Sequence, residues 1–246
     1  MAAYSWGLIV VPAGVLGGFL LHWFTIRRIR DPEERLPYCR GAYLAFSLQL
    51  LLYAWAIFFL VSGGRPGAVL IPLGMTFSFT GDYFNLQFPI VRKRLSEPVF
   101  LGILCFAVAQ IFYIAGFLFL IPLNELMDHG FLIPLLILFL AVPAAVFRLR
   151  IFKKERPKTL MRGGFLYGFA LGAMVAVAVS ATLVRGGYWC AVAVGALFFL
   201  VSDAVMGQTT LRGRHPSYEY QIPWGTYLAA QGLILFGTAV EFFIRG

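Results

Sequence analysis

The chain is dominated by eight runs of about 20 mostly apolar residues, joined by short polar connectors. A helix needs about 20 apolar residues to cross the hydrocarbon core of a bilayer. Because 60% of the residues are hydrophobic and only 13% are charged, a water-soluble domain of this length could not bury its apolar surface. The sequence therefore predicts an all-α, polytopic membrane bundle forming one domain over residues 1–246. We expect eight transmembrane helices near 5–26, 41–61, 67–90, 98–122, 130–147, 164–184, 187–207 and 222–244.

The distribution of basic residues predicts how these helices are oriented. Of the 20 Lys and Arg residues, 17 lie in alternate connectors and only Arg65, Arg185 and Arg245 lie on the other side. This positive-inside bias places both termini on the non-cytoplasmic side. The net charge of +9 is thereby explained by topology, and no nucleic-acid partner is expected. We expect an integral multi-pass protein of a bacterial inner membrane rather than of an organelle membrane.

Two pairs of polar residues are separated by the same interval. Asp82 and Asp203 lie 121 positions apart, as do Gln110 and Gln231. The predicted helices that carry each pair run in the same direction across the membrane. This interval favours two four-helix halves related by a parallel repeat, which is a common plan for membrane domains with a central site.

Asp82 and Asp203 are the two carboxylates that fall deep inside predicted spans. A charged Asp at the centre of a membrane helix costs roughly 2.5–3.5 kcal/mol on insertion scales, so such residues are usually functional. Both are nine or ten residues from a basic connector, which predicts similar depths on the cytoplasmic side. Since the spans contain no Lys or Arg to neutralise the pair, we expect the carboxyls to share protons. A protonated carboxyl close to an ionised one is suited to general acid–base chemistry.

Further polar side chains fall in the same layer of the predicted bundle. They are candidates for orienting a substrate or a water molecule: Gln49, Asn85, Gln110, Tyr113, Ser202, Tyr227 and Gln231. A hydrogen-bond network that only joins helices is the alternative explanation. His129 falls on the opposite face from His22 and His215, so the histidines and aspartates do not converge on a metal ion. We therefore predict neither a metal nor a cofactor.

Three ordered motifs resemble those of the lysoplasmalogenase family, the YhhN-like multi-pass membrane proteins. The first is the Gly-Asp pair at 81–82, and the second is the Gly195–Asp203 run, which is similar to a G-x-L-x-F-x-x-S-D motif. The third is the Y-x-x-x-Q pattern of Tyr227 and Gln231. One departure is Gln110, because the family commonly has an Ala-His pair at this position, and the change places in doubt any role of that histidine.

The resemblance implies hydrolysis of the vinyl-ether bond of lysoplasmalogens, which gives a fatty aldehyde and glycerophosphoethanolamine or glycerophosphocholine. Asp82 and Asp203 would then be the catalytic acid and base, in an order that the sequence leaves open. The expected partners are this lyso-ether phospholipid and the membrane lipids. Basic residues at the predicted cytoplasmic mouth would hold the head-group phosphate, namely Arg92, Arg212 and Arg214.

Three other functions remain open from the sequence. Paired membrane aspartates also serve as proton relays, so a proton-coupled transporter of lipids or small solutes is the main alternative. A non-catalytic lipid-binding protein is the second. The third is a hydrolase that acts on another ether lipid or lyso-lipid.

Overall fold

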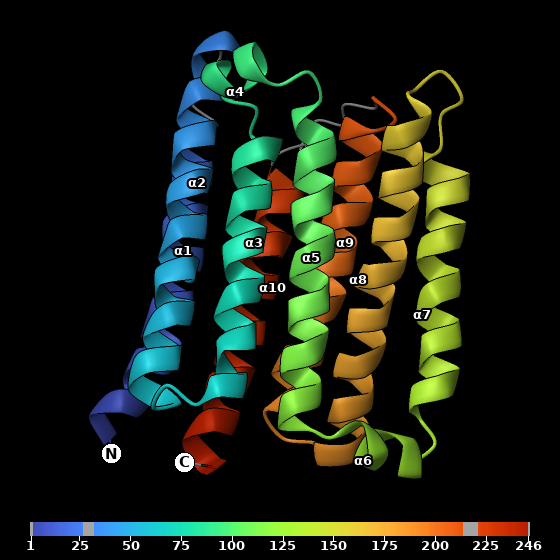
Figure 1. Ribbon diagram of the computed structural model, residues 1–246. Coiled ribbons are helices and arrows are strands. Elements are labelled where there is room, and N and C mark those ends of the chain that lie inside the picture. Colours follow the sequence, from blue (N-terminus) through green and yellow to red (C-terminus); the bar gives the residue numbers. More distant parts are fainter. Residues whose placement is uncertain (1, 27–31, 214–220, 246) are drawn as a thin grey trace.

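The computed structural model describes residues 2–26, 32–213 and 221–245, which form an all-helical bundle (Figure 1). Two short helices, α4 (Pro89–Arg94) and α6 (Leu123–Asp128), lie in connectors. The predicted spans left out α6 and included only the first two residues of α4. The long helices are α1 (Ala2–Ile26), α2 (Pro32–Ala56), α3 (Leu70–Asn85), α5 (Pro98–Leu120), α7 (Leu132–Val146), α8 (Lys158–Arg185), α9 (Trp189–Thr210) and α10 (Gln221–Arg245).

The lengths and composition of these helices are those of a multi-pass membrane protein. Over the described residues, six helices are long and apolar enough to cross a membrane: Cys39–Val61, Pro98–Leu120, Leu132–Ile151, Lys158–Arg185, Trp189–Thr210 and Gln221–Ile244. The other two predicted spans correspond to an apolar stretch at Ile9–Thr25 and to the 16 residues of α3. The prediction of eight spans, with both termini on one given side of the membrane, therefore stays a prediction.

Helix α3 ends earlier than the sequence predicted, and this places Asp82 in its last turn. The helix stops at Asn85, and Gln87 then adopts a left-handed conformation with φ 48°. Pro89 begins α4 after this turn, because proline at the first position of a helix needs no intrahelical N–H bond. We call the end of the bundle that carries α4 and the α7–α8 connector the basic end. Helix α1 begins and α10 ends at the opposite end (Figure 1).

Close helix contacts recur in the two halves of the chain at an interval of 121 residues. In the first half, a Cβ atom on Gly74 would lie 2.8 Å from the Tyr113 ring; in the second, one on Gly195 would lie 3.1 Å from Ile234. The contact between Gly116 and Ile71 recurs in the same way between Gly237 and Val192. Glycine permits such close approaches of membrane helices. These paired contacts support the predicted arrangement of two four-helix halves.

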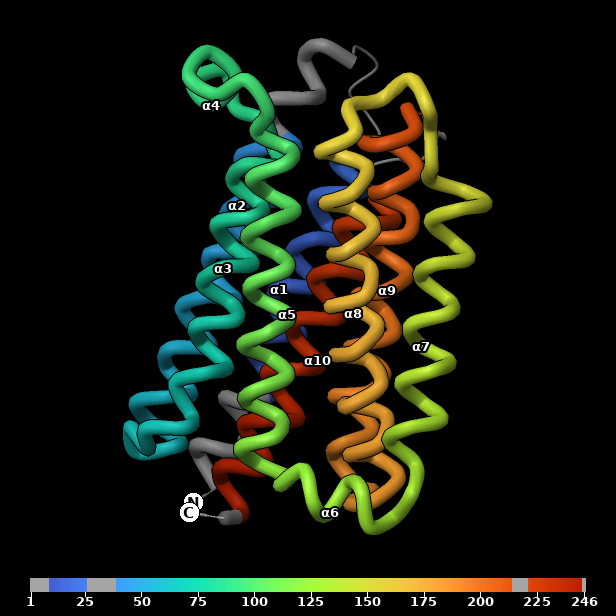
Figure 2. The backbone as a smooth tube through the Cα atoms, turned by 45° about the vertical axis from the view of Figure 1, so that its right-hand side comes forward, coloured from blue at the N-terminus to red at the C-terminus, as the bar shows by residue number. Residues whose placement is uncertain are grey.

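Helix α7 lies at the outside of the bundle and packs mainly against α8 (Figure 2). The contact depends on Gly172 of α8, where a Cβ atom would lie 1.9 Å from the backbone oxygen of Phe139. Pro143, four residues after Phe139, has no N–H group to bond that oxygen. From Phe147 to Ile151 the chain continues as a π-helix that touches α9.

Replacing Gly172 by alanine is expected to lower the free energy of unfolding by about 1–3 kcal/mol, because the added methyl group would push α7 away from α8. Gly168→Ala is the matched control, since a Cβ atom there would make an ordinary 3.4 Å contact with Pro143. Thermal unfolding of the purified variants in detergent measures the difference. Equal midpoints for the two variants would contradict this account of the α7–α8 contact.

Candidate active site

Asp82 is a buried carboxylate whose hydrogen bonds come from two other helices. Its side chain is 2% exposed. The Ser47 hydroxyl of α2 donates to Asp82 Oδ2 at 2.5 Å, and the Tyr227 hydroxyl of α10 donates to the same oxygen at 2.7 Å. These two hydrogen bonds, from α2 and α10, fix the Asp82 side chain in one orientation.

A chain of buried polar groups extends from Tyr227 toward the middle of the bundle. Gln231 Nε2 donates to the Tyr227 hydroxyl oxygen at 3.3 Å, and the Tyr113 hydroxyl donates to Gln231 Oε1 at 2.7 Å. Tyr113 and Gln231 are completely buried. Three of the residues predicted to orient substrate or water, namely Tyr113, Tyr227 and Gln231, thus belong to one network with Asp82.

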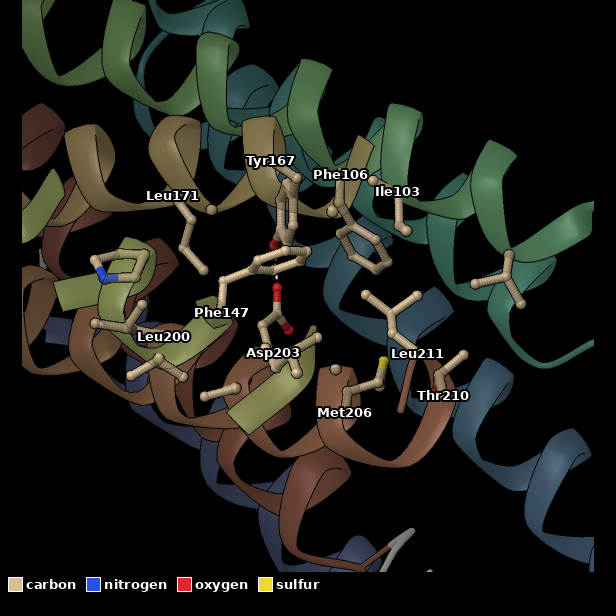
Figure 3. Close-up of a pocket in the computed structure, with 18 of the residues that line it drawn as sticks. Ile103, Phe106, Phe147, Tyr167, Leu171, Leu200, Asp203, Met206, Thr210 and Leu211 are labelled. Carbon is tan, nitrogen blue, oxygen red and sulfur yellow. Dashed lines mark hydrogen bonds between the residues drawn. The ribbon is translucent and has the colours of Figure 1, made fainter. Parts of the chain in front are cut away.

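Asp203 has a separate partner and a more open position. It is partly buried, and its Oδ2 accepts a hydrogen bond from the hydroxyl of Tyr167 in α8. Figure 3 shows the Tyr167 and Asp203 side chains pointing toward each other within a cavity. Sequence patterns did not indicate Tyr167, because a single tyrosine in a glycine-rich span belongs to no motif.

The two aspartates lie on either side of contacts between equivalent residues of the two halves. Asn85 Nδ2 approaches Met206 Sδ at 3.5 Å, and the Phe106 and Tyr227 rings are 6.1 Å apart. Each of these pairs is separated by 121 residues, and a residue meets its own counterpart only near an axis that relates the two halves. Asp82 and Asp203 therefore flank the centre of the repeat, and no direct hydrogen bond joins them within the described residues.

A narrow cavity of about 110 Å³ lies beside Asp203. Its walls come mainly from α5, α7, α8 and α9, with Asn85 at the end of α3 and the π-helix after α7. They are apolar apart from Asn85 and three polar residues labelled in Figure 3: Tyr167, Asp203 and Thr210. We call this cavity the groove. Asp82 does not line it.

A larger cavity of about 550 Å³ lies at the basic end. Three arginines line it, Arg40, Arg92 and Arg156, together with one carboxylate, Glu97. We call this cavity the vestibule. The groove and the vestibule share four lining residues: Asn85, Val99, Met206 and Thr210. The two cavities are therefore adjacent, and the junction lies one helical turn beyond each aspartate.

Three of the predicted site residues lie elsewhere or have other partners. Gln49 is exposed on the outer surface of α2, and Ser47 rather than Gln49 reaches Asp82. The Ser202 hydroxyl donates to the Pro223 carbonyl oxygen at 2.9 Å. Arg212 does not line the vestibule, because its guanidinium donates to the carbonyl oxygens of Leu149 and Arg150. Arg214 lies outside the described residues.

Gln110 is completely buried. Its amide lies beside the hydroxyl of Tyr167, the partner of Asp203. The predicted site residue Gln110 is therefore near the Asp203 side of the site, not in the network around Asp82.

A third buried carboxylate, Glu241, lies at the end opposite the vestibule. It is 1% exposed, and the Tyr188 hydroxyl and the indole N–H of Trp189 both donate to its Oε2. Over the described residues, no three His, Cys, Asp or Glu side chains cluster as metal ligands would.

The arrangement brings a buried carboxylate and a cavity-lining carboxylate to the junction of an apolar groove and a basic vestibule. Such a site can transfer protons to an amphiphilic ligand with an anionic head group. A family model described as the YhhN family matches residues 42–238, which include both aspartates and most of the site. Neither curated proteins nor solved structures gave a match to the chain.

Proposed function

The chain belongs to the YhhN family, which includes lysoplasmalogenases, and on this premise we propose that it hydrolyses the vinyl-ether bond of lysoplasmalogens. The observation that carries the proposal is the pair Asp82 and Asp203, each one helical turn from the junction of the apolar groove and the basic vestibule, with Asp203 lining the groove. An ether lipid with one hydrocarbon chain and a phosphate head group has the polarity of these two cavities. We further propose that the basic end faces the cytoplasm.

The reaction begins with transfer of a proton to the alkene carbon that does not carry the ether oxygen. This step forms a C–H bond and leaves an oxocarbenium ion, which a nearby carboxylate stabilises, as in glycoside hydrolysis. Water then adds to the cationic carbon and gives up a proton, forming a hemiacetal. The hemiacetal loses the glycerol oxygen as an alcohol, so one water yields one aldehyde and one glycerophospho head group.

Asp203 is proposed as the proton donor because it lines the groove, whereas Asp82 lines neither cavity. After the first transfer, the Asp203 carboxylate accepts the proton of the attacking water. Asp82 accepts two hydroxyl hydrogen bonds on one oxygen, and an ionised carboxylate acts only as an acceptor. It would therefore supply negative charge close to the oxocarbenium ion. Tyr227 and Gln231 hold it in place, and Asn85 lies at the junction where the reacting bond would sit.

The direct test is to supply the protein, purified and placed in lipid nanodiscs, with lysoplasmalogen. Fatty aldehyde and the glycerophospho head group are expected in equal amounts. The control substrates are 1-acyl and saturated 1-O-alkyl lysophospholipids of the same chain length, which should give no product. Release of fatty acid from the acyl lipid, without aldehyde from the vinyl ether, would overturn the proposal.

Arg92→Gln is expected to raise KM about tenfold and to leave kcat unchanged, because Arg92 lines the vestibule and would bind the phosphate of the head group. Arg94→Gln is the matched control, since Arg94 lies on the same short helix but does not line the vestibule. Steady-state kinetics of aldehyde release provide the measurement. Equal increases in KM for the two variants would show a general effect of surface charge and would contradict head-group binding by Arg92.

Proton-coupled transport is the second candidate, and the buried carboxyl of Glu241 at the opposite end is the observation that favours it. Transport would need a polar path along the bundle from Asp82 to Glu241. Ile234 and Leu235 of α10, completely buried between Gln231 and Glu241, disfavour such a path. Solute counterflow in liposomes, with no aldehyde released from lysoplasmalogen, would support transport over hydrolysis.

A further inference from the structure

The groove is present in one half of the repeat and is filled in the other. Five of its lining residues have counterparts 121 positions away on α1, α2 and α10: Ile103 with Trp224, Phe106 with Tyr227, Pro143 with His22, Gly164 with Tyr43, and Tyr167 with Phe46. These counterparts are rings in contact with one another. The Tyr43 and Trp224 rings stack at 4.8 Å, and His22 lies 5.8 Å from Tyr43 and 6.1 Å from Phe46.

Helix packing also differs between the groove and its filled counterpart. In the first half, α1 packs against α10, and the Phe19 ring lies 2.9 Å from where a Cβ atom on Gly225 would be. Its counterpart α7 packs on α8 and makes at most sparse contact with α5 over the described residues. The space between α7, α5 and α9 is the groove. Gly164, in place of a tyrosine, leaves this space open.

We propose that the groove binds the single hydrocarbon chain of the lipid substrate, and that the filled counterpart in the first half excludes a second chain. This inference rests on the proposed function and specifies how the site selects lyso-lipids over two-chain lipids. The vestibule supports the assignment, because its three arginines, against one carboxylate, complement an anionic head group. A lipid with its head group in the vestibule and its chain in the groove places the first bonds of the chain at the junction, one helical turn from Asp203.

The orientation of the groove indicates how the chain enters. Its lining residues on α9 run from Leu200, past Asp203, to Thr210 at the basic end. Beside them, α9 exposes Leu197 and Val201, and α7 exposes Leu138 and Val142, to the surroundings of the bundle. A chain therefore passes sideways from the bilayer between α7 and α9, while its head group stays at the basic end.

A photoreactive lipid tests this assignment without requiring turnover. The probe is a saturated 1-O-alkyl lysophospholipid with a diazirine near the end of its chain, added to the full-length protein in nanodiscs. Cross-links are mapped by mass spectrometry. We expect labelling on α7, α8 and α9 beside the groove, and competition by unlabelled lyso-lipid but not by diacyl lipid. Labelling around His22 and Phe46, or equal competition by diacyl lipid, would overturn the proposal.

Gly164→Tyr is the matched variant, because it introduces into the groove the residue that occupies the equivalent position in the first half. A Cβ atom at Gly164 would meet only side-chain ends, those of Leu211 at 2.9 Å and Phe147 at 3.3 Å, which can move. Groove labelling should fall at least tenfold. Ile111→Phe on the exposed face of α5, away from both cavities, should leave it unchanged. Unaltered labelling in Gly164→Tyr would contradict the proposal.

The mapping in the unmodified protein keeps the inference testable if Gly164→Tyr does not fold. The results also separate this inference from the proposed function. Groove labelling without hydrolysis of lysoplasmalogen would retain the chain site and overturn the enzyme activity. Aldehyde release without groove labelling would retain the activity and overturn the chain site.

Discussion

Asp203→Asn is expected to lower kcat for aldehyde release by about 10²–10⁴-fold, the usual contribution of a positioned proton donor. The amide keeps the size of the side chain and can still accept the hydrogen bond from Tyr167, but it cannot give a proton to carbon. Since Asp203 lines the groove without filling it, binding of a saturated alkyl lyso-lipid should remain. The measurement is turnover of lysoplasmalogen alongside photolabelling by the saturated probe.

Asp128→Asn is the matched control for this variant. Asp128 is an exposed carboxylate at the end of α6, and α6 lies at the end of the bundle opposite the vestibule (Figure 1). Its neutralisation should leave turnover unchanged. If Asp203→Asn retains more than half of the wild-type kcat, another group donates the proton.

Asp82→Asn is expected to lower kcat on the order of 10²–10³-fold, which is typical for loss of one preorganised electrostatic contact with a transition state. The variant removes the charge but leaves an oxygen that can accept the hydrogen bonds from Ser47 and Tyr227. KM should change little, because Asp82 lines neither cavity. Steady-state kinetics, with thermal unfolding to verify the fold, provide the test.

Ser47→Ala separates the charge of Asp82 from its orientation. It leaves the carboxylate and the Tyr227 bond in place while removing one donor, so kcat should fall by less than in Asp82→Asn. If kcat falls equally or more in Ser47→Ala, with both variants folded, then the local structure around α2, and not the charge of Asp82, controls the rate.

Hydrophobic run length predicted the helices well, because the bilayer imposes one length scale on every span. The family suggested by the ordered Asp and Tyr/Gln motifs is confirmed by the match over residues 42–238. The end of α3 was predicted too late. Apolar residues continue past Asn85, whereas the left-handed Gln87 and Pro89 break the helix. Composition does not record such local backbone changes.

The network around Asp82 was partly predictable from motifs, and its remaining members were not. The positions of Tyr113, Tyr227 and Gln231 within the predicted spans place them in the same layer as the aspartates, which predicts their participation. Gln49 was assigned to the same layer, but it faces outward, because a polar residue on a mostly apolar helix does not reveal which side packs inward. Tyr167 and Ser47 carry ordinary side chains without distinctive spacing, so only the three-dimensional packing of α8 and α2 reveals their contacts with the aspartates.

Charge patterns predicted the basic end but not the role of each arginine. Arg92 lines the vestibule, whereas Arg212 bonds to carbonyl oxygens at the end of the α7 segment. Arg40 and Arg156, which the sequence assigned only to topology, also line the vestibule. The sequence shows that an arginine lies in a basic connector. The direction of its side chain depends on the fold, because the fold decides which carbonyl oxygens are available to accept its hydrogen bonds.

The most direct test of the account is hydrolysis in D₂O with the position of the isotope determined in the aldehyde. The aldehyde would be reduced at once to the alcohol, so that later exchange is avoided, and analysed by mass spectrometry and NMR. Protonation of carbon by a fixed carboxylic acid predicts one deuterium on the carbon next to the carbonyl, in a single configuration. An aldehyde without that deuterium, or with both configurations in equal amounts, would contradict proton transfer from an aspartate in the site.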